Sequence, residues 1–399
     1  MIPAVQRPEH IPPHLEFDFD IFGDPRFEQD VQGSYADAVR NAPDIFWTPK
    51  NGGHWIVRRF DDITSVVNDY EAFSAREMQL PRIPDPLVLI PLNMDPPECV
   101  PFRMALMPYF SPRAIQGLEA RIRELAIGII EQVSGKGKCD FQYDVSSLFP
   151  VSVFMELMGM TPSGLRECRD MADSFFRSRT KEEFEASGTQ IIGALHALMA
   201  EKRAHPDGGL VSHLLKVDVG GRKMTDDEIT RTCFLLFLGG MDTVTNVTGF
   251  TFATLAQDSL LQKRLAADAS LIPKFVEEGL RCYGVSSSPR VVAKDCERFG
   301  IRFKEGEMVL CVLPISGRDD KQVPEPQRFN VDRDKQPHLT FSSGPHLCIG
   351  HLLARAEMRI FTEEWVKRIP SFRLQAGVNR GFRAGTVLGL LNLPIEWNL

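Results

Sequence analysis

Apolar residues recur at three- and four-residue spacing through the middle of the chain, a pattern that predicts long helices. The predicted helices span residues 113–133, 146–158, 189–203, 226–257, 271–283 and 352–367. Thr225, followed by Asp227 and Glu228, has the polar pattern of a helix start. Short strand-like runs are found at residues 45–48, 55–57, 290–293, 308–312 and 387–393. The pattern therefore predicts a mainly α fold with small β-sheets.

The organisation of the chain indicates a single domain. No internal repeat, low-complexity tract or Gly/Ser linker divides the sequence, so we expect one domain over residues 1–399, with residues 1–15 irregular. Proline-rich loops interrupt the pattern at 81–97, at 324–337 and around Pro345. Long irregular stretches in a compact domain usually carry function or pack against a cofactor. We therefore expect the functional site near these loops.

The composition is that of a large and mildly acidic chain. With 46 Lys and Arg against 53 Asp and Glu, the net charge is −7, which argues against a nucleic-acid partner. Residues 1–20 lack the pattern of a signal peptide. No apolar run approaches the roughly 20 residues that span a bilayer, the best being 233–240. Eight scattered cysteines without a C-x-x-C pair indicate reduced thiols. We expect a cytoplasmic protein that binds no membrane.

The sharpest chemical pattern surrounds Cys348. The segment Phe-Ser-Ser-Gly-Pro-His-Leu-Cys-Ile-Gly, residues 341–350, leads directly into the helix predicted from residue 352. A cysteine just before a helix lies among free backbone N–H groups, which favour thiolate over thiol. Gly344 and Gly350 would allow tight turns and a close approach of the backbone to a flat ligand. An isolated cysteine is usually a core residue, so Cys348 depends on its neighbours for a functional interpretation.

The order Phe341, Gly344, His346, Cys348, Gly350 resembles the cysteine-ligand loop of the cytochrome P450 family. The resemblance implies the P450 fold, in which a long central helix lies over a haem. It also implies a haem b cofactor whose iron is bound by the Cys348 thiolate. Phe341 would pack near the sulfur, and His346 would hydrogen-bond a haem propionate.

Glu278 and Arg281 stand three residues apart on the helix predicted over 271–283. Such pairs are most often exposed and contribute little. They resemble the E-x-x-R motif of the same family, whose third member is an arginine before the cysteine loop, here matched by Arg328. The resemblance implies a structural charge network of Glu278, Arg281 and Arg328.

Two adjacent glycines, Gly239 and Gly240, interrupt the helix predicted over 226–257, at a cost of about 1 kcal/mol each. One explanation is tight helix packing, with Thr243 bonded back to its own helix. The other is a resemblance to the oxygen-binding kink of the family, which places Gly239 against the haem. Asp242 and Thr243 are then the catalytic acid and alcohol that deliver protons during O₂ activation. Asn246 either extends this polar chain or lies on the helix surface.

The segment Met94-Asp95-Pro96-Pro97-Glu98 resembles the family's lead into a helix beside the haem. Arg103 and Arg290 match its propionate-binding arginines, and bidentate guanidinium groups suit carboxylates. Cys99 stands where many members have a histidine. Arg103, Arg290 and His346 would then share the two propionates.

Substrate-binding positions follow by analogy with the family and are mostly apolar. They are Leu87, Leu89, Leu235, Leu238, Ser286, Ser288, Thr386 and Val387. The likeness is strongest to the soluble bacterial camphor-hydroxylating branch, in which a loop tyrosine holds the substrate ketone. Leu87 occupies that position here, so we expect a compact terpenoid or norisoprenoid other than camphor.

The branch also implies an external electron source. The chain has no flavin or iron–sulfur motif of its own, so we expect a [2Fe–2S] ferredoxin with its NAD(P)H-dependent reductase. We expect an acidic ferredoxin to dock on a basic patch. Its members are Arg76, Arg103, Arg333, Lys335 and Arg359. We expect a monomer.

Two alternatives share the cysteine motif. A peroxygenase would use hydrogen peroxide directly, and the Asp242–Thr243 pair counts against it because peroxide already carries the required protons. The other alternative is a non-enzymatic haem-binding protein or a haem-free helical scaffold. The carbon monoxide difference spectrum of the reduced protein distinguishes these from a haem-thiolate enzyme.

Overall fold

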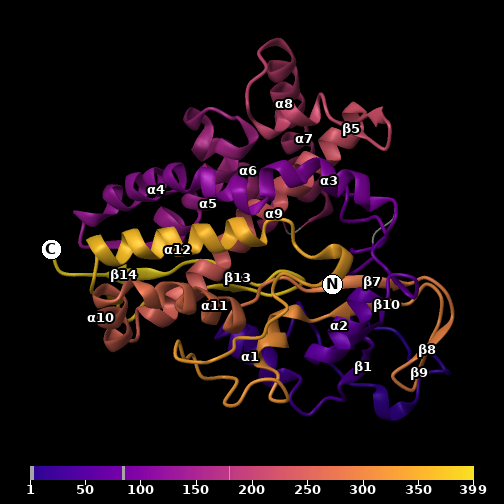
Figure 1. Cartoon of the computed structure of the whole chain (residues 1–399). Coiled ribbons are helices and arrows are strands. Elements are labelled where there is room, and N and C mark those ends of the chain that lie inside the picture. Colours follow the sequence, from indigo (N-terminus) through magenta and orange to yellow (C-terminus); the bar gives the residue numbers. More distant parts are fainter. Residues whose placement is uncertain (1–3, 83–85, 179) are drawn as a thin grey trace.

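Helices dominate the molecule (Figure 1), as the apolar spacing predicts. The structure is a computed structural model that describes residues 4–82, 86–178 and 180–399. Its α-helices are α1 (Val31–Ala38), α2 (Phe60–Asn68), α3 (Cys99–Phe110), α4 (Pro112–Ser134), α5 (Leu148–Met158), α6 (Leu165–Arg177), α7 (Lys181–Ala204), α8 (Leu210–Leu214), α9 (Asp226–Leu255), α10 (Ser259–Ala267), α11 (Ile272–Cys282) and α12 (His351–Arg368). A π-helical turn, Gln142–Ser146, precedes α5.

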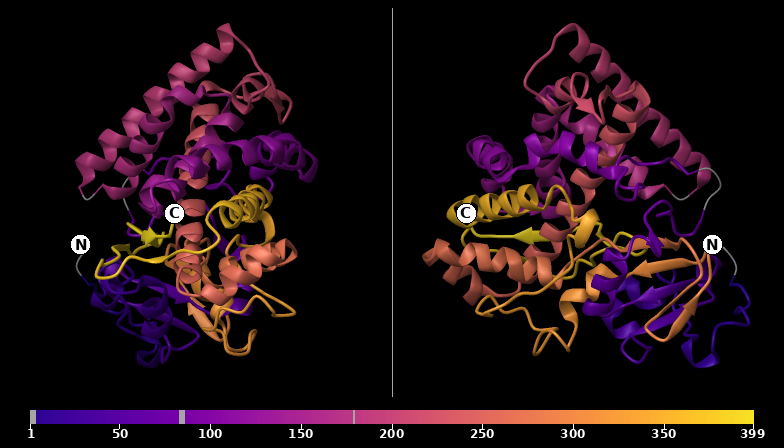
Figure 2. Two further views of the ribbon diagram at one scale, coloured as in Figure 1. Left: turned by 90° about the vertical axis from the view of Figure 1, so that its left-hand side faces the viewer. Right: turned by 45° about the vertical axis from the view of Figure 1, so that its right-hand side comes forward.

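The 30-residue helix α9 runs through the centre of the molecule (Figure 2). Its start is fixed by a capping box, in which the Thr225 hydroxyl accepts from the Glu228 N–H and the Glu228 carboxylate accepts from the Thr225 N–H. Within the described residues it is the one helix long and apolar enough to cross a membrane. However, 67% of its most apolar stretch is buried inside the protein, as is typical of a core helix.

The main sheet has five strands in the order β1-β2-β10-β7-β3. These strands are β1 (Ile45–Thr48), β2 (His54–Val57), β10 (Met308–Cys311), β7 (Ser288–Val292) and β3 (Phe73–Ser74). β2 and β10 are parallel, with Trp55 opposite Val309, and the other neighbours are antiparallel. All five strands are buried on both faces, and apolar residues accordingly make up most of β1, β2 and β10. The sheet lies at the opposite side of the molecule from α6, α7 and α8 (Figure 1).

Four small sheets complete the fold of the described residues. They are β11-β14-β4 (Arg373–Leu374, Pro394–Glu396, Lys138–Asp140), β12-β13 (Phe382–Arg383, Gly389–Leu390), β5-β6 (Asp218–Val219, Arg222–Lys223) and β8-β9 (Cys296–Arg298, Ile301–Phe303). The strand predicted over 387–393 is therefore divided. Val387 forms an isolated bridge with Ser286, and only Gly389–Leu390 is a strand.

Five predicted helices agree with helices of the structure, and both ends of each differ by at most a few residues. The observed helices are α4, α5, α9, α11 and α12. The prediction for α7 began at residue 189, whereas the helix begins at Lys181 behind a capping box formed by Thr180 and Glu183. Its first turns are polar and lack the apolar spacing on which the prediction relied. The apolar spacing did not predict α3, because Pro101 and Pro108 break the expected pattern of a helix, whereas the resemblance of residues 94–98 to the family did imply a helix here.

His54 on β2 makes the stability of the fold sensitive to acid. The side chain is 1% exposed, and burial lowers its pKa from 6.5 to about 4. Below pH 6.5 the unfolded chain binds a proton at this residue that the folded chain rejects, so unfolding is favoured as the pH falls. We expect up to about 3 kcal/mol to be lost between pH 6.5 and pH 4. His54→Leu should flatten this part of the pH profile in urea unfolding. An unchanged profile would contradict the assignment.

Candidate functional site

One interior cavity of about 460 Å³ joins the central helix to the loop before α12, a size typical of ligand pockets. Most of the predicted site residues lie in its wall. These are Leu87, Leu89, Arg103, Leu235, Gly239, Thr243, Ser286, Ser288, Arg290, Phe341, His346, Cys348, Gly350, Thr386 and Val387. Residues that are far apart in the sequence thus converge on one space. Asp242, Leu238 and Gly344 do not line it.

The Cys348 sulfur is open to this cavity. The backbone N–H of Cys348 donates to the carbonyl of Phe341 at 2.9 Å, which closes the loop, and α12 begins three residues later at His351. Burial raises the pKa of the thiol, although a Gly350 hydrogen bond and the charges of Arg103 and Arg355 oppose the rise. The backbone N–H group at the helix start thus favours thiolate, as predicted, but burial outweighs it in the chain alone. A bound metal ion deprotonates such a thiol by direct coordination.

Two buried side-chain nitrogens in the cavity wall have no hydrogen-bond partner among the described residues. They are Nη2 of Arg290 and Nε2 of His346. Arg290 is 1% exposed, and its Nη1 donates to Ser288 Oγ and to the Pro289 carbonyl, each at 2.7 Å. Leaving buried donors unpaired costs about 1–3 kcal/mol each, so their position indicates an anionic ligand. The two propionates of a haem fit this requirement. Arg103 lies nearby and donates to the Leu347 carbonyl at 2.6 Å.

The predicted glycines have different roles from one another. Gly350 lines the cavity, but its φ of −83° is open to any residue. Gly344 does not touch the cavity; its φ is +65°, and an added Cβ would lie 2.1 Å from Oδ1 of Asn68. Gly344 is therefore required by the left-handed turn and by close packing against α2. The structure thus bears out the tight turn expected at Gly344, and its contact with the cofactor stays a prediction.

The two glycines of α9 support both explanations that the sequence left open. A Cβ on Gly239 would meet nothing within 4 Å, so this position opens onto the cavity. A Cβ on Gly240 would lie 3.3 Å from the Phe154 ring, which is tight helix packing against α5. The Thr243 hydroxyl lines the cavity and donates to the Gly239 carbonyl at 2.7 Å.

Asp242 points away from the cavity that Thr243 faces. Its carboxylate forms an ion pair with Arg383 of β12 and accepts from Asn246 Nδ2 at 3.0 Å. Consecutive helix residues are about 100° apart, which separates the two side chains. Asn246 is 3% exposed, so it is not a surface residue. Its Oδ1 accepts from the Leu390 N–H at 2.9 Å, which ties α9 to β13.

The charge network behind the cysteine loop is buried but has a different third member. Arg281 and Glu278 are both 0% exposed and form a two-point ion pair at 2.7 Å. Arg333 Nε lies 3.1 Å from the same carboxylate and is 8% exposed. The side chain of Arg328 is 64% exposed and pairs with Glu325 instead. The assignment of the Arg328 side chain to the network is therefore wrong, although its carbonyl accepts from Arg281 Nη2 at 3.0 Å.

The predicted basic patch does not form. Arg333 is buried in the Glu278 network, and Arg359 is paired with Glu119 and Glu363 at 2.6 and 2.9 Å. Arg76 is 60% exposed and lies 3.3 Å from Glu98. Lys335 is exposed. Most of the expected positive charge is thus neutralised within the chain, because nearby carboxylates offer partners that the sequence order does not reveal.

The wall of the cavity also includes residues that the sequence did not identify. On α9, Leu236, Val244 and Val247 line it with Leu235, whereas Leu238 is turned away and packs against the core. Phe154 comes from α5, a helix without a recognisable motif. Glu357 of α12 is a buried acid in the wall, and burial raises its pKa well above the usual range. Glu357 lies at helical spacing from Leu353 and Phe361, and this apolar face of α12 was the available signal for its burial.

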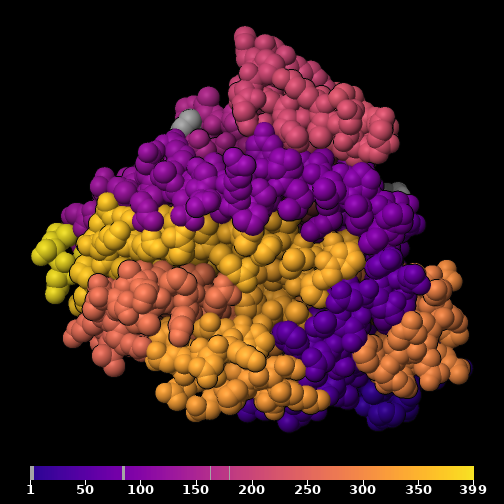
Figure 3. Space-filling view, in the orientation of Figure 1, coloured from indigo at the N-terminus to yellow at the C-terminus, as the bar shows by residue number. Residues whose placement is uncertain are grey.

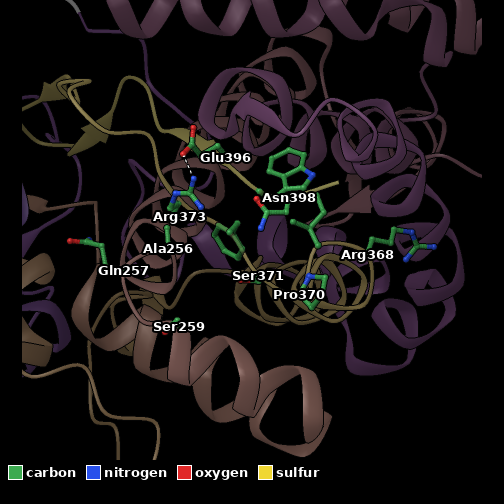
Figure 4. Close-up of a pocket in the computed structure, with 12 residues that line it drawn as sticks. Ala256, Gln257, Ser259, Arg368, Pro370, Ser371, Arg373, Glu396 and Asn398 are labelled. Atoms are coloured by element: carbon green, nitrogen blue, oxygen red, sulfur yellow. Dashed lines mark ion pairs between the residues drawn. The ribbon is translucent and has the colours of Figure 1, made fainter.

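A second hollow of about 410 Å³ lies near the C-terminus (Figure 4). Its volume is close to that of the interior cavity, so volume does not distinguish the two as candidate active sites. The residues that line them do. Its two arginines are already neutralised, Arg373 by Glu396 at 2.6 Å and Arg368 by Glu364 at 2.6 Å. The hollow offers neither a thiol nor an unpaired buried cation among the described residues that line it. The interior cavity is therefore the candidate active site.

A cysteine sulfur facing a cavity that also presents unpaired donors for carboxylates is the arrangement expected of a haem-thiolate protein. The cytochrome P450 family model matches residues 144–379. A curated relative, "Probable cytochrome P450 127A1" of Sinorhizobium fredii, is 30% identical over 98% of this chain and 96% of its own length.

Two solved structures are similar throughout. CYP101J2 has a TM-score of 0.91 and 34% identity, and CYP101C1 has a TM-score of 0.91 and 28% identity. Each comparison covers 99% of this chain and 100% of the other chain. The chain therefore belongs to the cytochrome P450 family, whose members are monooxygenases with a haem b bound through a cysteine thiolate. The predicted family, fold class, enzyme class and cofactor are confirmed.

Proposed function

We propose that this enzyme hydroxylates a compact hydrophobic substrate, a terpenoid or norisoprenoid, with electrons from a separate [2Fe–2S] ferredoxin and its NAD(P)H-dependent reductase. The proposal follows the likeness of its motifs to the camphor-hydroxylating branch. We further propose that it acts as a cytoplasmic monomer. When bound, the haem supplies O₂ activation and one-electron chemistry.

The observation that carries the substrate class is the composition of the cavity wall. Apolar residues dominate it, with Leu87, Leu89, Leu235 and Val387 among them. Besides Cys348, the ionisable lining residues are Arg103, Arg290, His346 and Glu357, and the two arginines and the histidine are assigned to the propionates. This leaves no cation in the described wall to anchor a fatty-acid carboxylate. A few hydroxyls, such as those of Ser286 and Thr386, can orient a polar group on the substrate.

In this proposal the Cys348 thiolate would bind the haem iron, and Arg103, Arg290 and His346 would hold the propionates. Thr243 orients water in the cavity through its hydroxyl, which is already fixed by the Gly239 carbonyl. Asp242 delivers protons from the outer side of α9 after its ion pair with Arg383 opens. The buried Glu278–Arg281–Arg333 network holds the segment before the cysteine loop against α11.

The test is a reconstituted reaction of the holoenzyme with a [2Fe–2S] ferredoxin, its reductase, NADH and a panel of small terpenoids. A substrate-induced spin shift and a hydroxylated product are expected for at least one compact terpenoid. Thr243→Ala should keep NADH consumption but divert about ten-fold more of the electrons to hydrogen peroxide, because proton delivery loses its ordered hydroxyl. Thr243→Ser, which keeps a hydroxyl, is the matched control.

Three results would contradict the proposal. Product formation with hydrogen peroxide but none with ferredoxin and O₂ would indicate a peroxygenase. A holoprotein that binds no terpenoid and turns over under neither condition would indicate a non-enzymatic haem protein. Binding and oxidation of long-chain acids alone would overturn the substrate class.

A further inference from the structure

Three side chains with basic nitrogens surround the ring of Phe341 on the side of α11 and α12. The guanidinium carbon of Arg355 lies 4.6 Å from the ring centroid, within cation–π distance. The rings of His338 and His351 each lie 6.0 Å from it. α11 and α12 contact each other, and both are exposed in part on the face shown in Figure 3. The reaction proposed above gives none of these three residues a role.

Arg355 is fixed in place by bonds to two neighbours. Its Nε lies 2.5 Å and its Nη2 3.2 Å from the two carboxylate oxygens of Glu277, which is a bidentate pair. Its Nη1 lies 3.1 Å from Nδ1 of His351. Glu277 also lies 3.3 Å from Nε2 of His338. Burial would raise the pKa of Glu277, but the bonds to His338 and Arg355 prevail and lower it to about 2. Glu277 is therefore an anion at every working pH.

Phe341 links this pair of opposite charges to the sulfur. Its carbonyl accepts the Cys348 N–H at 2.9 Å, and its ring lines the cavity that the sulfur faces. The Arg355 charge thus acts on the thiolate across an aromatic ring and not across bulk water, so it is less screened than an exposed charge. Arg355 and Glu277 are 31% and 32% exposed, which leaves the pair only partly hydrated.

We propose that Arg355 and Glu277 are positioning residues of opposite sign that set the reduction potential of the iron bound at Cys348. Reduction adds one negative charge to the iron–thiolate unit. The stacked Arg355 cation stabilises that charge and raises the potential, and the Glu277 anion behind it offsets part of the effect. This inference rests on the haem-thiolate cofactor and is independent of the substrate and the electron partner.

The experiment is a spectroelectrochemical titration of the purified holoprotein with chemical mediators, without ferredoxin or substrate. Arg355→Met should shift the midpoint potential to a lower value, and Glu277→Gln should shift it to a higher value. The double variant should return towards the wild-type potential. Arg355→Lys, which keeps the charge, should move it less than Arg355→Met. Arg359→Met is the matched control, because Arg359 lies one turn along α12 and pairs with Glu119 and Glu363.

The opposite signs separate charge tuning from a merely structural role. If the two residues only held α11 against α12, both single variants would shift the potential in the same direction, and this would overturn the proposal. A shift in Arg359→Met as large as in Arg355→Met would also overturn it. If Arg355→Met does not retain haem, Glu277→Gln and Arg355→Lys still test the proposal. Only charge tuning predicts a higher potential for Glu277→Gln. Failure of the terpenoid or ferredoxin assays would leave these results unaffected.

Discussion

Cys348→Ser is expected to remove the red-shifted band of the reduced carbon monoxide complex and to reduce oxygenation below detection. A serine hydroxyl is far less acidic and less polarisable than a thiol, so it cannot donate electron density to the iron as a thiolate does. The cavity, the propionate donors and the rest of the loop should persist, because the loop is closed by the backbone bond from residue 348 to Phe341. The measurements are the difference spectrum, the haem content and product formation.

Cys296→Ser is the matched control for this variant. Cys296 is a partly exposed cysteine on β8 and does not line the cavity. The Cys296→Ser variant should retain the full carbon monoxide difference spectrum and full turnover. A thiolate spectrum that survives in Cys348→Ser, or that disappears in Cys296→Ser, would refute the assignment of the ligand.

Arg281→Met is expected to give the largest loss of stability of any substitution outside the cavity. It leaves the fully buried Glu278 carboxylate with Arg333 as its remaining cation. It also removes the donors to the carbonyls of Gly317, at 2.6 Å, and Pro326, at 2.8 Å. Breaking a buried ion pair from one side typically costs about 3–5 kcal/mol. Urea unfolding followed by far-UV circular dichroism and by the haem absorbance should show this loss.

Arg328→Met tests whether the third member of the charge network is Arg333, as in the structure, or Arg328, as the motif implied. Because the Arg328 side chain is 64% exposed and pairs only with Glu325 among the described residues, its loss should cost about 0.5 kcal/mol or less. The loss of stability in Arg333→Met should lie between the losses in the other two variants, since Glu278 keeps its ion pair with Arg281. Equal losses in the Arg328 and Arg281 variants would contradict the network described above.

The parts of the site that sequence reasoning found are those held in short contiguous motifs. The loop from Phe341 to Gly350 carries its own turn, its ligand and the helix start, so its local geometry follows from local sequence. Arg290 could be placed by its position after the E-x-x-R helix. The orientation of Asp242 was not within reach, because consecutive positions of α9 can both face the cavity, as Leu235 and Leu236 do.

The remaining errors concern contacts set by irregular backbone or by distant elements. Arg328 and Arg333 are five residues apart in a proline-rich loop, where no periodicity indicates which side chain turns inward. The pairing of Arg359 with Glu119 joins α12 to α4, and that of Asp242 with Arg383 joins α9 to β12. A single sequence contains no signal for such partnerships. Phe154 was missed for the same reason, because α5 reaches the cavity only through helix packing.

The parallel pairing of β2 with β10 affects the order in which the protein can be assembled during synthesis. β2 leaves the ribosome early, but its partner strand is translated about 250 residues later. Until then the edge of the β1–β2 hairpin is unpaired, which exposes nascent chains to association with one another. The cysteine loop follows β10 in the chain, so haem capture becomes possible only after both strands of this pair have been translated. Slow growth at low temperature and an early supply of haem should therefore improve the yield of holoenzyme.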